Sequence, residues 1–323
     1  MRARNALAQL AVTFTVAGCG PAVAIPPSVS VPPVGALPPE TSEVTAMPDQ
    51  QNSDCDTEAS LHPGPLPPPG AMPPDSTMAA IAERGRLIVG VDQNSSPFGS
   101  RNPSTGNLEG FDIDVAHEMA RAIFGDPAKI DLRVLDATQR ESALMSGQVD
   151  IVVRTYSITC DRKLKVDFST TYYLANQKIL VLKGSGIDSA AALAGKRVCA
   201  VRGTTSLSRL FTLDPRPRVF ATPTWTDCLV MLQQGQVDAI STDDAVLAGL
   251  VEQDESNVEM VGDSMGIEPY GVGIAKKHDD LVRFVNGVLE QMRTDGTWER
   301  LYDNDLRERL GPSPGPPPPR YQD

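Results

Sequence analysis

The chain has 323 residues, of which 41 are acidic and 29 are basic, with a formal net charge of −12 and a pI near 4.8. Nucleic-acid binding depends on Lys and Arg that neutralise phosphates, so this acidity excludes most phosphate-backbone binders. The 28 prolines are concentrated in 21–74 and 312–319, and the stretch between them, 76–311, exceeds the roughly 100–150 residues typical of one domain, which favours two lobes.

The first residues have the features of an export signal. Arg2 and Arg4 precede an apolar stretch over 6–16, which ends in Val-Ala-Gly-Cys at 16–19. This stretch is too short to span a membrane, and no apolar run of 18 residues follows it, so no internal span is expected. The pattern resembles a lipobox, which implies a lipoprotein signal peptide over 1–18 and a lipid on Cys19. An ordinary signal peptide with an incidental cysteine is the alternative.

Proline-rich segments flank the central stretch. Prolines and small residues favour extended, poorly buried chain, so we interpret 19–75 as a lipid anchor and a spacer that holds a domain away from a bilayer. The segment 312–323 is expected to be a disordered tail, with a ligand for a polyproline-binding partner as the alternative. We expect the protein to be a monomer.

Five cysteines are present, and four remain once Cys19 is set aside. An even number in an exported chain predicts disulfides, and four cysteines allow three pairings. Cys199 lies in a strand-like run and Cys228 opens a helical run in the same presumptive lobe, so we pair these two, which leaves Cys55 with Cys160. Free buried thiols are the alternative. The three histidines have no ligand spacing and no CxxC occurs, so no metal or other cofactor is expected.

Strand-like and helical patterns alternate along the central stretch. In chain order, the first half predicts a helix over 79–83, a strand over 87–91, a helix over 110–124, a strand over 130–134, a helix over 138–146 and a strand over 150–153. The second half predicts strands over 196–201, 219–221 and 237–241, alternating with helices over 205–213 and 226–234. This order indicates a mainly parallel sheet with flanking helices in each half, and binding sites at the carboxyl ends of strands.

Several motifs resemble the polar amino-acid solute-binding proteins (family 3) of bacterial ABC importers. They are Ser-Ile-Thr-Cys-Asp-Arg-Lys at 157–163, Val-Asp-Phe-Ser-Thr-Thr-Tyr-Tyr at 166–173, Gly-Phe-Asp-Ile-Asp at 110–114, Val-Arg-Gly-Thr-Thr-Ser at 201–206 and Asp-Asp-Ala-Val-Leu-Ala-Gly at 243–249. The motifs occur in the family's order and cover essentially all of 76–311. The lipobox, proline spacer and extra cysteines are most similar to actinobacterial glutamine/glutamate-binding lipoproteins.

The resemblance implies an α/β fold, a two-lobed clamp like that of periplasmic binding proteins. Lobe 1 would comprise 76–171 and 273–311, and lobe 2 would comprise 177–267. The two crossings, at 172–176 and 268–272, would form the hinge. A ligand that contacts both lobes would favour the closed state.

The resemblance also implies which residues bind the ligand. Arg162 would pair with the α-carboxylate of an amino acid, because a planar guanidinium matches a carboxylate fork. Asp243 would accept the α-ammonium from the other lobe. Hydrogen bonds would come from both lobes, through Thr155, Ser157, Gly203, Thr204 and Thr205.

These assignments have structural alternatives. Arg162 could be a solvated partner of a neighbouring aspartate, and one of Asp243 and Asp244 could cap the next helix. Asp112 and Asp114 begin a helix, so we interpret them as capping and packing residues outside the site.

Departures from the family pattern indicate a polar pocket. Asp92 opens a polar run where many relatives carry an aromatic residue, and we include it in the site. Arg154 replaces a small residue, and Arg202 or Arg101 is placed to reach the cleft. A second buried cation needs an opposite charge, so we expect aspartate or glutamate as ligand, followed by asparagine and glutamine. An internal pair of Arg154 with Asp92 or Asp136 is the alternative.

Three classes of function are compatible with these features. The first is an extracytoplasmic receptor, lipid-anchored to the cell membrane, that delivers an amino acid to an ABC importer. A sensor subunit that signals through a membrane partner is a variant of this class, because it would use the same clamp. The second is an enzyme, because a few proteins of this fold are cyclohexadienyl dehydratases, but the motifs contain no unassigned Glu and no recognisable nucleophile–base arrangement. The third is an anchored scaffold without a ligand. We predict the receptor, with no catalytic residues.

Overall fold

The computed structural model describes residues 35–47 and 55–322. The predicted signal peptide over 1–18 and the lipid site at Cys19 lie outside the described residues and stay predictions. In the described ranges, no helix is both long enough and apolar enough to cross a membrane.

Lobe 1 contains a five-stranded sheet with the order β7-β3-β8-β16-β9. Its strands are β3 (Leu87–Val91), β7 (Ile130–Val134), β8 (Ile151–Val152), β9 (Val166–Phe168) and β16 (Gly273–Ala275). Its helices are α1 (Thr77–Arg84), α2 (Phe111–Phe124), α3 (Arg140–Met145), α4 (Cys160–Lys163), α8 (Asp279–Thr294), α9 (Thr297–Asp305) and α10 (Arg307–Leu310). A small sheet of β4 (Asn94–Ser95), β5 (Gly99–Arg101) and β6 (Leu108–Glu109) precedes α2.

Helix α2 illustrates why these segments fold as they do. Ile113, Ala116, Ala120 and Ile123 recur at helical spacing, and all four are buried in the lobe 1 core. The helix ends at Gly125, which has the left-handed conformation (φ 72°) that glycine adopts without a Cβ clash.

Lobe 2 contains a larger sheet with the order β1-β12-β11-β13-β10-β14, and β15 pairs with the first part of β10. The strands are β1 (Ser42–Val44), β10 (Tyr173–Leu182), β11 (Arg197–Val201), β12 (Arg218–Thr222), β13 (Ala239–Asp243), β14 (Val258–Val261) and β15 (Ile267–Tyr270). The helices are α5 (Thr205–Leu210), α6 (Trp225–Gln233) and α7 (Asp244–Gln253), with a 3₁₀ turn at Ala191–Leu193.

Both sheets are mixed, whereas the sequence predicted mainly parallel sheets. Strands joined by helical crossovers are parallel, as β3 is to β7 and β8 and as β11 is to β12 and β13. Strands that enter from the other lobe run antiparallel, namely β10 against β13 and β16 against β8. The antiparallel pairings of β10 and β16 therefore follow from the two crossings between the lobes, whereas the antiparallel edge strand β1 comes from the N-terminal segment.

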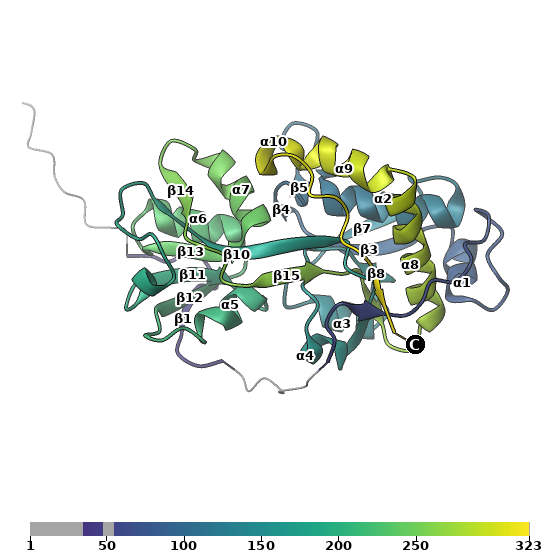
Figure 1. Ribbon diagram of the computed structural model, residues 1–323, viewed down its shortest axis with the longest axis horizontal. Coiled ribbons are helices and arrows are strands. Elements are labelled where there is room, and N and C mark those ends of the chain that lie inside the picture. Colours follow the sequence, from purple (N-terminus) through teal and green to yellow (C-terminus); the bar gives the residue numbers. More distant parts are fainter. Residues whose placement is uncertain (1–34, 48–54, 323) are drawn as a thin grey trace, which may run out of the picture. The chain divides into compact units, whose positions relative to one another are not determined.

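The two crossings lie side by side. Tyr173 to Asn176 at the start of β10 pair with Tyr270 to Ile267 of β15 in an antiparallel ladder. Figure 1 shows these two strands running between the two groups of helices. The crossings thus form a two-stranded connection between the lobes.

Parts of the expected spacer and tail are folded, which corrects two predictions. In the segment 19–75, β1 adds an antiparallel edge strand to β12, and β2 (Ala59–Ser60) pairs with the tail strand β17 (Arg320–Tyr321). Asn286, which is fully buried, donates to Ser60 Oγ at 2.9 Å and to the Leu61 carbonyl at 2.7 Å. An edge strand uses only one hydrogen-bonding side, so a proline-rich segment can pair there although proline lacks a donor.

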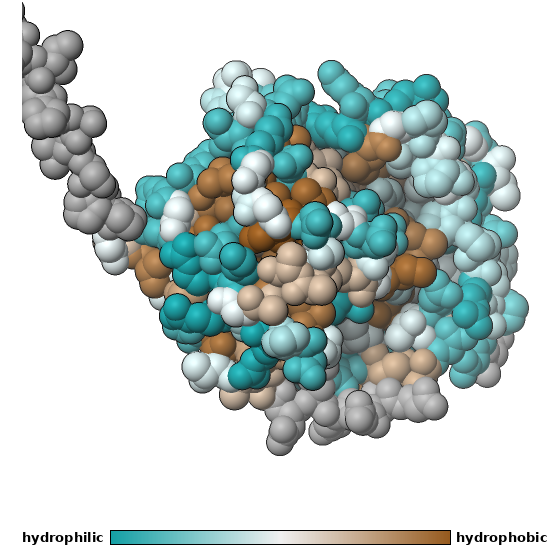
Figure 2. Space-filling model, turned by 60° about the vertical axis from the view of Figure 1, so that its left-hand side comes forward, coloured by the Kyte–Doolittle hydropathy of each residue, from teal (hydrophilic) through white to brown (hydrophobic). Residues whose placement is uncertain are grey.

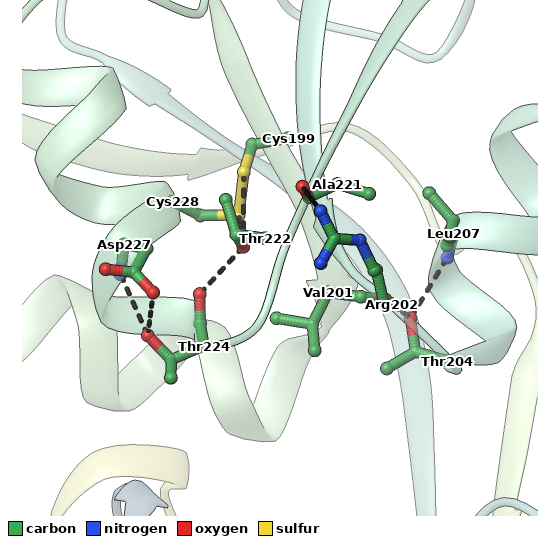
Figure 3. Close-up of a disulfide and its surroundings, with 10 residues drawn as sticks. All are labelled: Cys199, Val201, Arg202, Thr204, Leu207, Ala221, Thr222, Thr224, Asp227 and Cys228. Carbon is green, nitrogen blue, oxygen red and sulfur yellow. Dashed lines mark hydrogen bonds between the residues drawn. A yellow bond between two sulfur atoms is a disulfide. The ribbon is translucent and has the colours of Figure 1, made fainter. Parts of the chain in front are cut away.

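Both predicted disulfides are formed. Cys55 is bonded to Cys160 with a Cα–Cα distance of 5.7 Å, and Cys199 to Cys228 with 5.6 Å. The second joins β11 to α6 in the lobe 2 core (Figure 3). The first ties the end of the N-terminal segment to α4 of lobe 1.

The surface offers few large apolar side chains. On the face in Figure 2, hydrophilic residues surround separate groups of hydrophobic ones. Among the described residues, the exposed large hydrophobic side chains are Leu37, Val134, Met145, Leu164, Leu174 and Ile267.

Candidate functional site

A small, partly open cavity lies between the lobes. It opens where strands end, because Arg154 and Thr155 follow β8 and Asp243 is the last residue of β13. The side chains that line it are mostly polar or charged: Arg140, Arg154, Thr155, Ser157 and Arg162 from lobe 1, and Thr204, Thr205, Ser206, Trp225, Thr242, Asp243 and Val246 from lobe 2.

Two buried arginines of lobe 1 share one aromatic ring. The Arg140 guanidinium lies 4.2 Å from the centre of the Tyr156 ring and that of Arg162 lies 4.9 Å from it. Both donate across the cleft to the carbonyl oxygen of Gly203 in lobe 2, at 2.8 and 2.9 Å. Neither has a carboxylate partner among the described residues. Burial and the neighbouring Arg162 charge lower the pKa of Arg140 well below its usual value.

A third buried arginine is neutralised within lobe 1. Arg154 Nη2 lies 3.0 Å from Asp92 Oδ2, and Arg154 Nε donates to the Leu135 carbonyl at 2.8 Å. Asp92 also accepts the backbone N–H groups of Gln93 and Asn94. The internal Arg154–Asp92 pair, which the sequence left as an alternative, is therefore the one that forms, and Asp92 does not line the cavity.

On the lobe 2 side, the turn after β11 faces the arginines. Gly203 has φ 74°, which aims its carbonyl at lobe 1, and a Cβ there would lie 3.0 Å from Thr138 Cγ2. Thr204 Oγ1 accepts the N–H of Leu207 at 3.2 Å and so caps α5. Ser157 Oγ of lobe 1 lies 3.3 Å from Thr205 Oγ1, so the lobes are closed on each other at this point.

Asp243 is a buried carboxylate with one unpartnered oxygen. Its Oδ2 accepts the hydroxyl of Tyr270, while its Oδ1 has no hydrogen-bond partner. It is the N-cap residue of α7 but makes no capping bond; Asp244 Oδ1 lies instead against the Ala245 N–H at 2.8 Å. Burial and the charge of Glu268 raise the pKa of Asp243 to about 7. A ligand cation beside Oδ1 would satisfy this oxygen and favour its ionised form.

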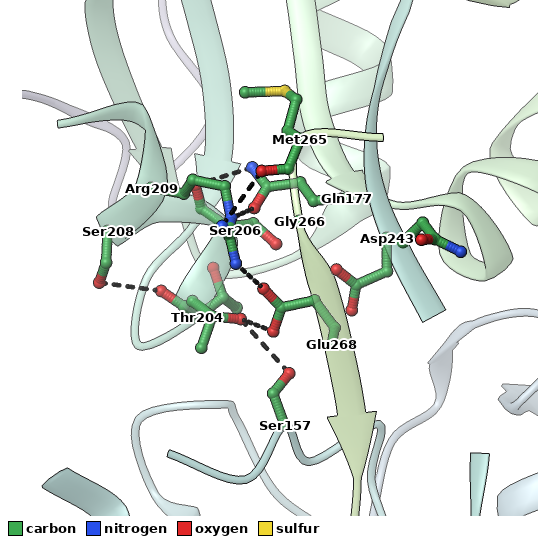
Figure 4. A network of polar contacts seen from close by, with 12 residues as sticks. Ser157, Gln177, Thr204, Ser206, Ser208, Arg209, Asp243, Met265, Gly266 and Glu268 are labelled. Carbon is green, nitrogen blue, oxygen red and sulfur yellow. Dashed lines mark hydrogen bonds and ion pairs between the residues drawn. The ribbon is translucent and has the colours of Figure 1, made fainter. Parts of the chain in front are cut away.

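A polar network connects this region to the crossing strand β15. Glu268, which is 2% exposed, accepts Thr205 Oγ1 at 2.7 Å and Arg209 Nη2 at 2.7 Å. Figure 4 shows Glu268 on its strand with Asp243 and Ser157 nearby. Residues of both lobes and of a crossing therefore meet at the cavity.

Most of the predicted site residues come together. Seven of them line the cavity: Arg162, Ser157, Thr155, Arg154, Thr204, Thr205 and Asp243. Gly203 and Asp92 contact lining arginines through a carbonyl and a carboxylate. Arg202 is a correction, because it does not line the cavity. Its guanidinium donates to Ser42 Oγ and to the Ala221 carbonyl, and Figure 3 shows the second of these contacts.

Sequence reasoning missed five lining residues, namely Arg140, Ser206, Trp225, Thr242 and Val246. Arg140 begins the short helix α3, where an arginine ordinarily faces solvent, but its side chain is 3% exposed. Trp225 begins α6 and covers the cavity from lobe 2, although the sequence departures had suggested a pocket without an aromatic cover. The sequence did contain a signal for Trp225, because this tryptophan directly follows an N-cap threonine near the end of a strand.

Metal binding finds no support in the described ranges. They contain no group of three His, Cys, Asp or Glu residues arranged to hold a metal ion. The cavity presents guanidinium groups on the lobe 1 side and a carboxylate on the lobe 2 side.

The chain was compared with protein families and characterised relatives. Residues 87–306 match the model of the bacterial extracellular solute-binding proteins, family 3. The chain is 36% identical over 233 residues to the ABC transporter glutamine-binding protein GlnH of Bacillus subtilis, covering 72% of this chain and 85% of the relative. It is 32% identical over 245 residues to the glutamate-binding protein GluB of Corynebacterium glutamicum, covering 72% and 82%.

Solved structures give the same picture of the fold. An ancestral arginine-binding protein bound to glutamine superposes with a TM-score of 0.64 at 34% identity, covering 71% of this chain and 99% of that one. A solute receptor for L-cysteine from Neisseria gonorrhoeae superposes with a TM-score of 0.70 at 26% identity, covering 73% and 96%. The predicted two-lobed α/β fold is confirmed by these neighbours.

Proposed function

Because this chain belongs to the bacterial extracellular solute-binding proteins of family 3, we propose that it is an extracytoplasmic receptor whose lobes close around aspartate, glutamate, asparagine or glutamine. It is anchored through a lipid on Cys19, binds its ligand without transforming it, and delivers it to the permease of an ABC importer. The hinge is the pair of crossings at 172–176 and 268–272.

The observation that carries the proposal is the separation of opposite charges across the cavity. Arg162 of lobe 1 offers guanidinium donors without a carboxylate partner, and Asp243 of lobe 2 offers an unpartnered oxygen. An α-carboxylate pairs with the first and an α-ammonium with the second, each through charge-assisted hydrogen bonds. A zwitterion then joins the two lobes and stabilises the closed state.

Charge balance favours a ligand with a second carboxylate. Arg154 is already neutralised by Asp92, but Arg140 has no carboxylate partner in the described ranges. Once an α-carboxylate and an α-ammonium have paired with Arg162 and Asp243, Arg140 is the lining arginine that still has no carboxylate partner in the described ranges. A side-chain carboxylate supplies the missing charge at Arg140, so we propose that aspartate and glutamate bind more tightly than asparagine and glutamine. Arg140 takes the role that the sequence assigned to Arg154.

The membrane partner is inferred from the relatives. The names of the Bacillus and Corynebacterium relatives refer to an ABC transporter and to glutamate binding, which supports an ABC permease as partner and a ligand of this class. A sensor subunit that signals through a membrane partner is the alternative, because a sensor and a permease both recognise a closed clamp.

Thermal unfolding of the purified full chain with each of the twenty amino acids tests the ligand class. A ligand at a hundred times its Kd stabilises the native state by about 2.7 kcal/mol, which raises the Tm by several degrees. We expect a saturable rise with aspartate, glutamate, asparagine and glutamine and no rise with leucine or lysine. No rise with any amino acid would refute the proposal.

Two matched variants test the charge assignment. Arg140→Gln should weaken glutamate at least tenfold more than glutamine, because only glutamate needs a cation at its side chain. Arg154→Gln should affect both ligands similarly, since Arg154 already has Asp92 as its partner. Equal losses for the two ligands in Arg140→Gln would remove Arg140 from the recognition of the side chain.

A further inference from the structure

Thr155 is held in an unusual backbone conformation at the cavity. Its φ is +37°, and the other described residues besides glycine with positive φ are Glu40, Asp75 and Lys277. Among these four, Thr155 alone is β-branched and alone lines the cavity between the lobes. Side chains branched at Cβ clash with their own backbone in this region, so the conformation persists only where the surroundings hold it.

A buried carboxylate holds this conformation. Asp112 Oδ2 accepts the backbone N–H of Thr155 at 2.7 Å, and Asp112 is 1% exposed. Its other oxygen, Oδ1, accepts the hydroxyl of Tyr172 at 2.7 Å. Both oxygens are therefore engaged outside helix α2, on which Asp112 lies.

The sequence predicted a capping and packing role for Asp112, and the observed arrangement is not capping. The N-cap residue of α2 is Gly110, and no side chain caps this helix end. Asp112 instead reaches to the segment after β8 and to the start of the first crossing. Burial raises the pKa of Asp112 to about 6, and its hydrogen bonds to Tyr172 and Thr155 oppose that rise.

The residues on either side of Thr155 explain why its conformation matters. The Arg154 carbonyl accepts a hydrogen bond from Arg140 Nη1 at 3.5 Å, and the Arg154 side chain pairs with Asp92. Tyr156 presents the ring on which Arg140 and Arg162 lie. A change of φ at Thr155 would rotate these two neighbours relative to each other and displace the guanidinium groups.

Tyr172, the second residue that Asp112 binds, lies at the start of the first crossing. The Tyr172 N–H donates to the Tyr270 carbonyl at 2.9 Å, and the Tyr172 carbonyl accepts Trp298 Nε1 at 2.7 Å. Asp112 is therefore bound to a residue that is itself fixed on both sides. Through this residue it is tied to the crossing as well as to Thr155.

We propose that Asp112 is a positioning residue for ligand binding, which holds Thr155 in its left-handed conformation and so places the arginines of the cavity. This inference rests on the proposed function and adds a residue that does not touch the ligand. The role follows from geometry: a buried acceptor, a strained β-branched residue at the cavity, and the binding groups on both sides of it.

The test compares substitutions of Asp112 in two backgrounds, with L-glutamate as the probe and isothermal titration of the full chain. Asp112→Ala should weaken glutamate at least tenfold in the Thr155 protein. In a Thr155→Gly background the same substitution should cost less than threefold, because glycine adopts positive φ without being held. Equal losses in both backgrounds, or a loss below twofold in the Thr155 protein, would overturn the proposal.

A conservative variant and a control keep the test decisive. Asp112→Asn retains an oxygen for the Thr155 N–H, so it should lose only about threefold in affinity, and that loss should disappear in the Thr155→Gly background. If Asp112→Ala fails to fold, Asp112→Asn takes its place in the comparison. A loss of glutamate affinity in Asp112→Asn that persists in the Thr155→Gly background would overturn the proposal. Asp114→Asn, on the same helix, should change affinity less than twofold.

Amide hydrogen exchange supplies a measurement that needs no ligand. The Thr155 N–H should be protected in the unsubstituted protein and in Asp114→Asn, and should exchange at least tenfold faster in Asp112→Ala relative to the rest of lobe 1. In Asp112→Asn, which keeps an acceptor oxygen, the increase should be smaller than in Asp112→Ala. Unchanged protection would overturn the contact. If the unsubstituted protein binds no amino acid, the proposed function fails, while the exchange measurement still decides whether Asp112 holds Thr155.

Discussion

Replacing Gly249 by alanine should prevent the lobes from closing. Gly249 lies within α7 of lobe 2, and a Cβ built on it would lie 1.9 Å from the carbonyl oxygen of Ser96 in lobe 1 and 2.6 Å from its carbonyl carbon. Non-bonded carbon atoms prefer separations of about 3.5–4.0 Å, so the two backbones would have to move apart by more than about 1 Å. Backbone on both sides leaves no flexible side chain to absorb the shift.

The size of the effect follows from the contacts that closure makes. Arg140 and Arg162 donate across the cleft to the Gly203 carbonyl, and hydrogen bonds from charged groups contribute about 1.5–3 kcal/mol each. Losing one of them corresponds to at least about tenfold weaker binding, since tenfold is about 1.4 kcal/mol. The free protein should not lose stability, because alanine is favoured over glycine within a helix by about 0.5–1 kcal/mol.

Titration calorimetry with glutamate, thermal unfolding without ligand, and small-angle scattering with and without ligand measure these quantities. Gly249→Ala should bind glutamate at least tenfold more weakly, keep or raise its ligand-free Tm, and lose the decrease in radius of gyration on ligand addition. Gly287→Ala is the matched control, because its Cβ would meet the end of the Leu66 side chain, at 2.9 Å, within lobe 1. Unchanged affinity together with normal compaction in Gly249→Ala would refute the reasoning.

Three further predictions follow from the site and the disulfides. Arg162→Ala should weaken glutamate at least tenfold without changing the circular dichroism spectrum; an unchanged Kd would remove Arg162 from the α-carboxylate site. Burial beside Glu268 raises the pKa of Asp243 to about 7, so below pH 7 this carboxyl must lose a proton before it accepts an α-ammonium. Affinity should therefore fall about tenfold per pH unit from 6.5 to 5, and this slope should disappear in Asp243→Asn. Replacing Cys55 and Cys160 by serine should lower the free energy of unfolding by about 1 kcal/mol more than replacing Cys199 and Cys228, because the longer closed loop, with a sequence separation of 105 against 29, removes more entropy from the unfolded chain. Denaturant titration that gives the reverse order would contradict this explanation.

Much of the site could be predicted from sequence because its motifs are local, and the cysteine pairs could be predicted because four cysteines allow only three pairings. Arg162 lies in a motif whose spacing is specific, and the even cysteine count limits the pairings. Arg140 could not be predicted, because a single arginine at the start of a short helix carries no sign that another lobe will bury it. Its burial depends on Gly203, 63 residues further along the chain, and becomes visible only in three dimensions.

Composition misled the prediction for the terminal segments for a related reason. Proline density predicts poor burial on average, but a few well-placed residues are enough to fold such a segment onto an existing core. Leu61, Leu66 and Met72 pack against lobe 1, and Tyr321 donates its hydroxyl to Glu290 at 2.6 Å. Composition averages over these contacts, so it cannot separate a solvated proline-rich chain from one that follows a surface.

The residues of the crossings connect ligand recognition to the proposed closure. Tyr270 of the second crossing donates its hydroxyl to Asp243, and Glu268 of the same strand accepts Thr205. Tyr172 of the first crossing donates to Asp112, which holds Thr155. In this structure, in which Ser157 and Thr205 bring the lobes into contact, these hydrogen bonds hold residues of both lobes around the cavity. The crossings therefore contribute to the orientation of residues that line the cavity, in addition to connecting the lobes that carry them.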